Sequence, residues 1–109
     1  MKAKPVVPRA LACRDVDDAI GYYLNEATAE AAIGFIDALE QAYARISRHA
    51  GTGSPRYAHE LNLPVMRSWP LTRYPYLVFY VDRFDHIDVW RVLHGHRDIP
   101  VWMQESEVP

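Results

Sequence analysis

The spacing of hydrophobic residues predicts a first helix near the N-terminus. From Asp15 onward, apolar side chains recur every three or four positions, which is the period of one helical face. The stripe consists of Val16, Ile20, Tyr23, Leu24 and Ala27. Asp15, Asp17 and Asp18 stand where this helix would begin, and the helix dipole favours negative charge there. The pattern therefore predicts a helix over about residues 15–26.

A longer hydrophobic stripe predicts a second helix directly afterwards. Thr28 can cap it, because a threonine side chain accepts a hydrogen bond from the first helical turn. The stripe consists of Ala32, Phe35, Ile36, Leu39, Ala42, Tyr43 and Ile46, and the helix ends before Gly51, Gly53 and Pro55. So broad a stripe indicates core packing. Two helices joined this closely form an antiparallel hairpin.

The second half of the chain changes to the pattern of β-strands. Segments 65–72, 76–82 and 86–94 are rich in β-branched and aromatic residues, and short breaks separate them. Residues 5–11 add a fourth strand, which lies at an edge or is irregular because its two prolines lack an N–H group. The element order is strand, helix, helix and three strands, which is an α+β arrangement.

The length of 109 residues suits one small domain, which we place at residues 1–98. For the C-terminal tail, residues 99–109, two arrangements are open: it covers one end of the sheet, or it stays mobile. Cys13 is the only cysteine, which excludes an internal disulfide and favours a reduced, cytoplasmic setting. We expect no secretion signal and no membrane span, because prolines interrupt the N-terminal segment and every apolar run is short.

Charge is distributed unevenly along the chain. Residues 1–44 hold four Lys or Arg against seven Asp or Glu, whereas residues 45–100 hold eight Arg, no Lys and five Asp or Glu. Arginine favours bidentate contacts with carboxylates or phosphates. The net charge is nevertheless -2, and proteins that neutralise many phosphates are usually far more positive. We therefore expect no direct sequence-specific binding of nucleic acid.

Several short motifs follow one another over roughly residues 6–98. They are Asp17-Asp18-Ala19-Ile20 with Tyr23, then Ala32, Phe35, Ile36 and Leu39, then Gly53-Ser54-Pro55, Met66-Arg67-Ser68-Trp69, Tyr74-Pro75-Tyr76-Leu77-Val78-Phe79-Tyr80, Arg91-Val92-Leu93-His94 and Arg97-Asp98. No single motif is diagnostic. Together they resemble the ParE branch of the ParE/RelE superfamily, the toxins of bacterial type II toxin–antitoxin modules.

The resemblance implies a helical hairpin packed on a small, mostly antiparallel sheet in the order β-α-α-β-β-β. It also implies a ParD-like antitoxin whose C-terminal segment wraps the toxin. Because ParE-like relatives poison DNA gyrase by binding, we expect a toxin of that kind, which is not an enzyme and needs no cofactor. Two alternatives are open: a RelE-like, ribosome-dependent mRNA endoribonuclease, and an inactive toxin that only binds its antitoxin.

Arg67 and Arg91 fall in the middle of predicted strands, where a guanidinium needs a carboxylate, a phosphate or water. Three interpretations are open: ion pairs with acidic residues of the same chain, such as Asp88, contacts with the antitoxin, or catalysis. Strict alternation along the last strand places Arg91 on the same side as Val89. Both sides of that strand are largely apolar, so the side that faces the helices stays open.

His94 is the candidate proton carrier of the ribonuclease alternative, together with Arg67 and Arg91. Histidine titrates near neutral pH and can activate a 2′-hydroxyl or protonate a leaving oxygen. However, the next residue is glycine, and the nearest downstream aromatic, Trp102, cannot transfer a proton. A structural histidine that closes the strand is therefore favoured. His94 and His96 make a weak metal site without a cysteine nearby, so we expect no metal.

Aromatic residues close to arginines mark the candidate interfaces, because both residue types are enriched at the energetic centre of protein interfaces. The predicted antitoxin contacts are Arg67, Trp69, Tyr80 and Arg91. Arg97 and Trp102 are the predicted target contacts, because this segment combines a cation and an indole near the sheet edge.

Overall fold

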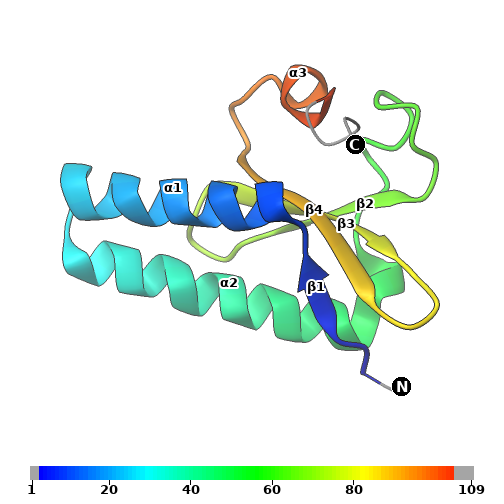
Figure 1. The fold of residues 1–109 in the computed structure, drawn as a ribbon, viewed down its shortest axis with the longest axis horizontal. Helices are drawn as coiled ribbons and strands as arrows, with labels where there is room; N and C mark the ends of the chain where they lie inside the picture. Colours follow the sequence, from blue (N-terminus) through cyan, green and yellow to red (C-terminus); the bar gives the residue numbers. More distant parts are fainter. Residues whose placement is uncertain (1–2, 105–109) are drawn as a thin grey trace.

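The computed structural model describes residues 3–104 and contains two long helices, a sheet and a short third helix (Figure 1). The elements are β1 (Val6–Pro8), α1 (Ala10–Glu26), α2 (Ala29–His49), the 3-10 turn η1 (Ala50–Thr52), β2 (Met66–Pro70), β3 (Tyr76–Asp82), β4 (Ile87–His94) and α3 (Ile99–Gln104). This β-α-α-β-β-β order confirms the predicted α+β fold, with α3 added at its C-terminal end.

The sheet has the strand order β1-β4-β3-β2. β2, β3 and β4 form an antiparallel meander, and β1 runs parallel to β4 at the edge. The predicted edge position of the proline-containing first strand is confirmed. At the opposite edge, the backbones of Ser54 and Ser68 exchange hydrogen bonds of 2.9 Å, and Pro70 lacks an N–H group. Both features limit pairing of β2 with a further strand.

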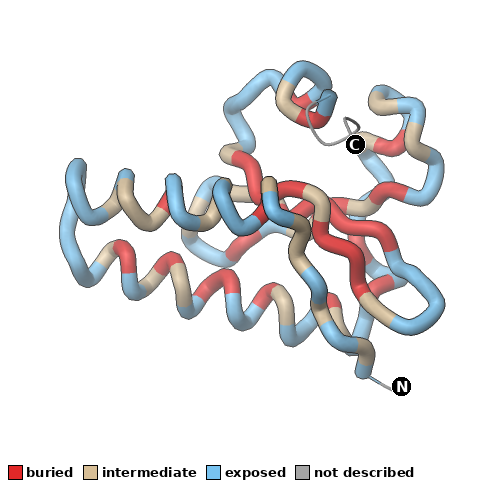
Figure 2. Tube along the Cα trace, viewed as in Figure 1, coloured by how far each residue is buried: buried red, intermediate tan, exposed pale blue. Residues whose placement is uncertain are grey.

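Side chains from the two faces of the sheet form two hydrophobic cores. On one face, α1 and α2 lie side by side and bury residues such as Phe35, Leu39 and Ile46 against Val78 and Val89 (Figures 1 and 2). The second core contains Met66, Phe79, Leu93, Ile99 and Met103. The central strands are therefore buried on both sides, which explains why their sequences show no clean alternation of polar and apolar residues.

The first helix begins earlier than the hydrophobic pattern predicts. It starts at Ala10 rather than near Asp15, and Arg9 precedes it without a side-chain cap. Asp15 is thus not a first-turn residue beside the helix dipole, which corrects the sequence interpretation. The predicted cap of the second helix is confirmed, because the Thr28 side chain accepts a hydrogen bond of 3.0 Å from the Ala31 N–H.

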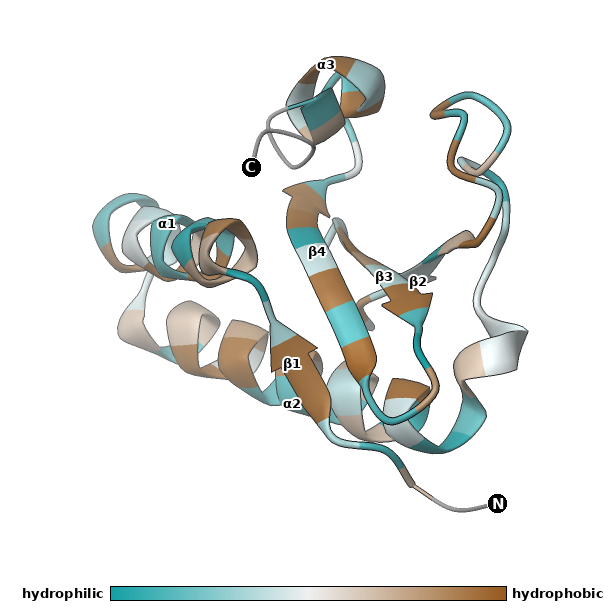
Figure 3. Ribbon diagram, turned by 45° about the vertical axis from the view of Figure 1, so that its right-hand side comes forward, coloured by the Kyte–Doolittle hydropathy of each residue, from teal (hydrophilic) through white to brown (hydrophobic). Residues whose placement is uncertain are grey.

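A bulge in β4 corrects the predicted alternation of its side chains. Tyr80 pairs with Val89, but the preceding residue Phe79 pairs with Arg91, so Trp90 has no partner in β3. An extra residue of this kind reverses the alternation of faces beyond it. Val89 and Val92 consequently lie in the helix-side core, although strict alternation would put them on opposite faces. Figure 3 shows β4 between β1 and β3, with hydrophobic and hydrophilic residues along it.

Residues 99–104, which the sequence analysis assigned to a tail, form α3 and cover the second face of the sheet. Ile99 and Met103 are buried there, so this segment takes the first of the two predicted arrangements. Residues 105–109 of the predicted tail lie outside the described residues. No helix within residues 3–104 is both long enough and apolar enough to cross a bilayer.

Candidate functional site

Arg91 is a buried arginine held by an acidic residue of the same chain. Its side chain is 2% exposed, and two of its nitrogens, Nε and Nη2, donate hydrogen bonds of 2.7 Å to the Asp15 carboxylate. Asp15 also accepts the backbone N–H of Val92 at 3.0 Å, and Nη1 of Arg91 donates to the Trp102 carbonyl at 2.6 Å. The first of the three interpretations therefore describes Arg91, which forms an ion pair with an acidic residue of its own chain. That residue is Asp15 rather than the predicted Asp88.

Asp88 binds other groups on the outer side of β4. Its carboxylate accepts hydrogen bonds from Arg9 at 2.9 and 3.0 Å, from Arg83 at 3.1 and 3.2 Å, and from the Trp90 indole at 3.0 Å. Burial alone would raise the pKa of Asp88, but these hydrogen bonds outweigh burial and lower that pKa below its usual value. This cluster joins the start of α1 to the β3–β4 hairpin.

Tyr80 and Arg67 both bind backbone carbonyls beside the 3-10 turn that follows α2. Tyr80 is fully buried, and its hydroxyl donates a hydrogen bond of 2.6 Å to the Ala50 carbonyl. Burial raises the pKa of Tyr80 to about 12. Arg67 is half-buried and donates from Nη1 to the Gly53 carbonyl at 2.7 Å. Both side chains therefore stabilise the connection between α2 and the sheet.

The predicted antitoxin contacts differ in how much surface they present. Arg67 and Trp69 are partly exposed on the edge strand β2, whereas Tyr80 and Arg91 are buried. The antitoxin contacts remain predictions for all four residues. For Tyr80 and Arg91, the structure provides an intramolecular role that the sequence analysis did not assign.

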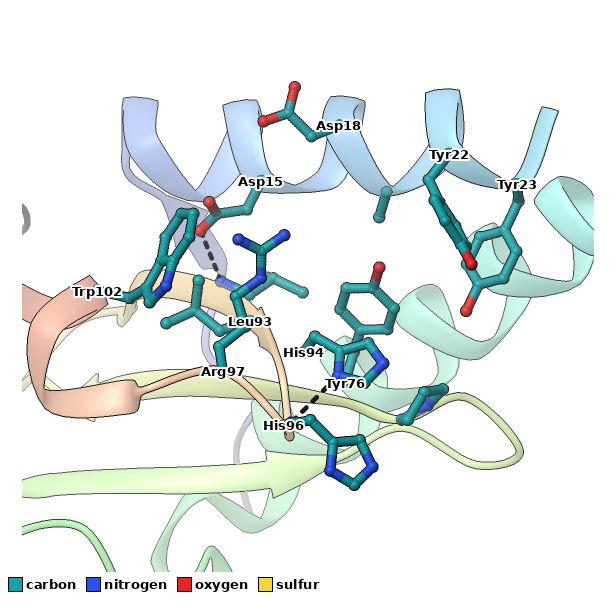
Figure 4. Close-up of a pocket in the computed structure, with 13 residues that line it drawn as sticks. Asp15, Asp18, Tyr22, Tyr23, Tyr76, Leu93, His94, His96, Arg97 and Trp102 are labelled. Atoms are coloured by element: carbon teal, nitrogen blue, oxygen red, sulfur yellow. Dashed lines mark hydrogen bonds between the residues drawn. The ribbon is translucent and has the colours of Figure 1, made fainter. Parts of the chain in front are cut away.

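A pocket of about 470 Å³ opens between α1, the adjoining ends of β3 and β4, and the segment that leads to α3 (Figure 4). It contains both predicted target contacts. The Arg97 guanidinium lies 4.0 Å from the centre of the Trp102 ring, which is a cation–π distance. In Figure 4 the Arg97 side chain points toward α1, with Trp102 on one side and Tyr76 on the other.

His94 also lines this pocket, at the end of β4. Its ring packs edge-on against Tyr76, with 5.2 Å between the ring centres, and its Nδ1 accepts the backbone N–H of His96 at 3.1 Å. Desolvation lowers the pKa of His94, and the nearby His96 and Arg97 lower it further. These contacts agree with the predicted structural histidine.

The three residues of the ribonuclease alternative do not meet in one pocket. His94 lines the pocket, but Arg67 and Arg91 are not among its lining residues. The guanidinium groups of Arg67 and Arg91 are bound to Gly53 and Asp15, respectively. Within residues 3–104, no group of three His, Cys, Asp or Glu side chains is placed to hold a metal ion.

Sequence reasoning missed Asp15 as the partner of Arg91, and Tyr22 and Tyr23 as walls of the pocket. The pairing of Asp15 depends on where α1 crosses β4, and a single sequence carries no signal for that crossing. Tyr22 is different, because it lies off the hydrophobic stripe of the predicted helix. An aromatic side chain on the polar side of a helix could have marked Tyr22 as a candidate site residue.

Comparisons with known proteins agree with this architecture. The chain is similar, with 17% sequence identity and a TM-score of 0.71, to a solved chain of a chromosomal ParDE toxin–antitoxin system from P. aeruginosa. The match covers 86% of this chain and 98% of that chain, and at this identity it speaks for the fold alone. No curated protein matches the chain. Residues 6–99 match the family described as the ParE toxin of the type II toxin–antitoxin system parDE. Since that match spans most of the chain, this protein belongs to the ParE toxin family of type II toxin–antitoxin systems.

Proposed function

We propose that this toxin is neutralised by a ParD-like antitoxin and, when free, poisons DNA gyrase by binding to it. The observation that carries the proposal is the pair formed by Arg97, which is exposed, and Trp102, which is half-buried. Its guanidinium and indole are stacked, and no carboxylate within the described residues forms an ion pair with Arg97. Arginine and tryptophan are the residue types that most often anchor protein interfaces. A gyrase target implies that the toxin acts in the cytoplasm.

Poisoning of this kind requires differential binding rather than catalysis by the toxin. A ligand that binds the gyrase–DNA cleavage state more tightly than the other states of gyrase increases the population of that state. The toxin then needs a rigid contact surface and no proton-transfer machinery. The stacked Arg97 and Trp102 supply such a surface, because α3 is packed on the sheet through Ile99 and Met103.

The separation of Arg67, Arg91 and His94 favours this proposal over the ribonuclease alternative. An endoribonuclease would need its catalytic groups within reach of one scissile phosphate. Here the Arg91 guanidinium is buried against Asp15, on a different strand from Arg67. The inactive-toxin alternative makes no demand on these residues, and growth arrest tests it directly.

We assign the antitoxin interface to the edge of the sheet at β2. Arg67 and Trp69 are the predicted antitoxin contacts that present surface there. Tyr80 lies opposite Arg67 on the neighbouring strand β3, and Arg91 lies one strand further in, on β4. Substitution of Arg67 or Trp69 by Ala is expected to weaken antitoxin binding, because truncation of an interface anchor typically costs about 2 kcal/mol or more.

The experiment that tests the target surface is the double substitution Arg97→Ala with Trp102→Ala. We expect growth arrest to be lost, while the antitoxin still binds through Arg67 and Trp69 at the edge of the sheet. The bond from Arg91 to Trp102 uses the backbone carbonyl, so the substitution does not remove it. Arg48→Ala is the matched control, because Arg48 is an exposed arginine on α2 outside the pocket. Full toxicity of the double variant would contradict the assignment.

A further inference from the structure

The pocket beside Arg97 carries more hydrogen-bond donors than the described chain uses. Tyr22 and Tyr23 on α1 and Tyr76 on β3 turn their rings toward one another around it (Figure 4). Within residues 3–104, none of these three hydroxyls takes part in a hydrogen bond with another residue. Tyr74 and Tyr80 differ, because their hydroxyls donate to backbone carbonyls at 2.9 and 2.6 Å. Three phenol donors thus remain available at the pocket.

The charges around the pocket add a single permanent cation to these donors. Asp15 is neutralised by Arg91, so it does not compete for a second cation. Arg97 has its guanidinium on the Trp102 ring and forms no ion pair with a described carboxylate. Asp18 is exposed at the rim, on the same helix as Asp15. The site therefore presents the Arg97 guanidinium next to neutral tyrosine hydroxyls. The Asp18 carboxylate at the rim would repel a bound anion.

We propose that this pocket binds the carboxylate of an acidic side chain from the antitoxin. The proposal rests on the proposed function, because it takes the antitoxin as the partner. A carboxylate is planar and carries one negative charge, which matches the two-nitrogen edge of one guanidinium. Trp102, Tyr23 and Ala19 supply the apolar surface that the hydrocarbon stem of a glutamate or aspartate needs.

A phosphate group fits the same pocket less well. A phosphate of nucleic acid lies among neighbouring phosphates, and its binding needs several cations along the protein surface. Here the net charge of the chain is -2, and Asp18 stands at the rim. The chemistry of the site thus favours a single carboxylate on a peptide.

Neutralisation follows directly from occupation of this pocket. An antitoxin side chain seated between Tyr76 and Arg97 would cover Arg97 and Trp102, which are the residues we assign to the target. The antitoxin would then exclude the target by occupying the same surface, without a change in the fold of the toxin.

The test uses the full chain, and N-acetyl-glutamate N-methylamide is the probe. The corresponding glutamine compound is the matched uncharged control, and inorganic phosphate is the second anion. Binding is followed by NMR through the His94 and Trp102 resonances. We expect the glutamate probe to bind weakly and the glutamine probe not to bind.

Arg97→Ala should weaken binding of the glutamate probe about tenfold or more, the usual effect of losing a charged hydrogen bond. Asp18→Asn should strengthen it, because it removes a like charge, and Arg48→Ala should leave it unchanged.

Two results would overturn the proposal. Equal binding of the glutamate and glutamine probes would show that charge is not recognised. Tighter binding of phosphate than of the glutamate probe would assign the pocket to a phosphate ligand instead. Tyr76→Phe, which removes one hydroxyl and keeps the ring, is expected to weaken binding of the glutamate probe several-fold. Because neither gyrase nor antitoxin is present, failure of this test is distinct from failure of the proposed function.

Discussion

The side chains of Asp15 and Arg91 form a buried ion pair although 76 positions separate them in the sequence. Asp15 lies on α1 and Arg91 on β4, and Arg91 continues the connection to α3 through the Trp102 carbonyl. One ion pair therefore fixes the three elements that surround the pocket. The position of Arg97 and Trp102 relative to α1 depends on it.

Loss of the charge on Asp15 should destabilise the fold strongly. We expect Asp15→Asn to lower the free energy of unfolding by about 3–5 kcal/mol, because it removes the charge that compensates a buried arginine. Urea denaturation measures the change. Asp17→Asn is the matched control, since Asp17 is an exposed residue of the same helix, and it should change stability by no more than about 0.5 kcal/mol. Equal changes in the free energy of unfolding for the two substitutions would show that the Asp15–Arg91 ion pair does not stabilise the fold.

Gly53 and Gly51 provide a second matched pair. A Cβ atom at Gly53 would overlap the Tyr80 hydroxyl, which is buried and bound to Ala50, whereas a Cβ at Gly51 meets open space. Gly53→Ala is therefore expected to cost about 1–3 kcal/mol, the usual range for overpacking. Gly51→Ala should be close to neutral. Thermal unfolding of both variants measures the difference, and a stable Gly53→Ala protein would refute the close contact.

The pKa of His94 predicts a decrease in stability toward acidic pH. Desolvation and the neighbouring His96 and Arg97 lower this pKa below the usual value of 6.5. The unfolded chain consequently takes up the proton first, so the contribution of His94 is present above about pH 6.5 and is lost as pH falls through the lower, folded-state pKa. Urea unfolding from about pH 7.5 to 5.5 should show a smaller loss of stability for His94→Gln than for the wild type. Parallel pH profiles for the two proteins would count against the lowered pKa.

His94 also separates the proposed function from the ribonuclease alternative. We expect His94→Gln to arrest growth much as the wild type does, because binding to gyrase needs no proton transfer. Loss of a general acid or base typically lowers a catalytic rate by about 10²- to 10⁴-fold. Growth curves after induction, at matched protein levels, measure the effect. A variant that is folded but harmless would favour the ribonuclease.

Most of the fold could be predicted from the sequence, because its long elements have a strong hydrophobic period. Thr28 and the stripe that follows it define α2, and strand Tyr76–Asp82 matches the predicted segment 76–82. The bulge at Trp90 could not be predicted, since it depends on pairing with β3. It changes which side chains of β4 face the helices, and strict alternation fails there.

The candidate site was less accessible to sequence reasoning than the fold. Arg97 and Trp102 were singled out, and the structure brings them into contact. Tyr80 and Arg91 were predicted to be interface residues because aromatic residues and arginines are enriched at interfaces, yet both have buried partners within the chain. Partners of this kind come from distant segments, and a single sequence does not show which segments meet.

Pulse-labelling of DNA and protein synthesis within minutes of inducing the toxin alone tests the central claim most directly. Gyrase poisoning predicts that DNA synthesis falls first, while protein synthesis continues. The Arg97→Ala and Trp102→Ala double variant should leave both unchanged. An early fall in protein synthesis with DNA synthesis intact would contradict the account and support cleavage of messenger RNA.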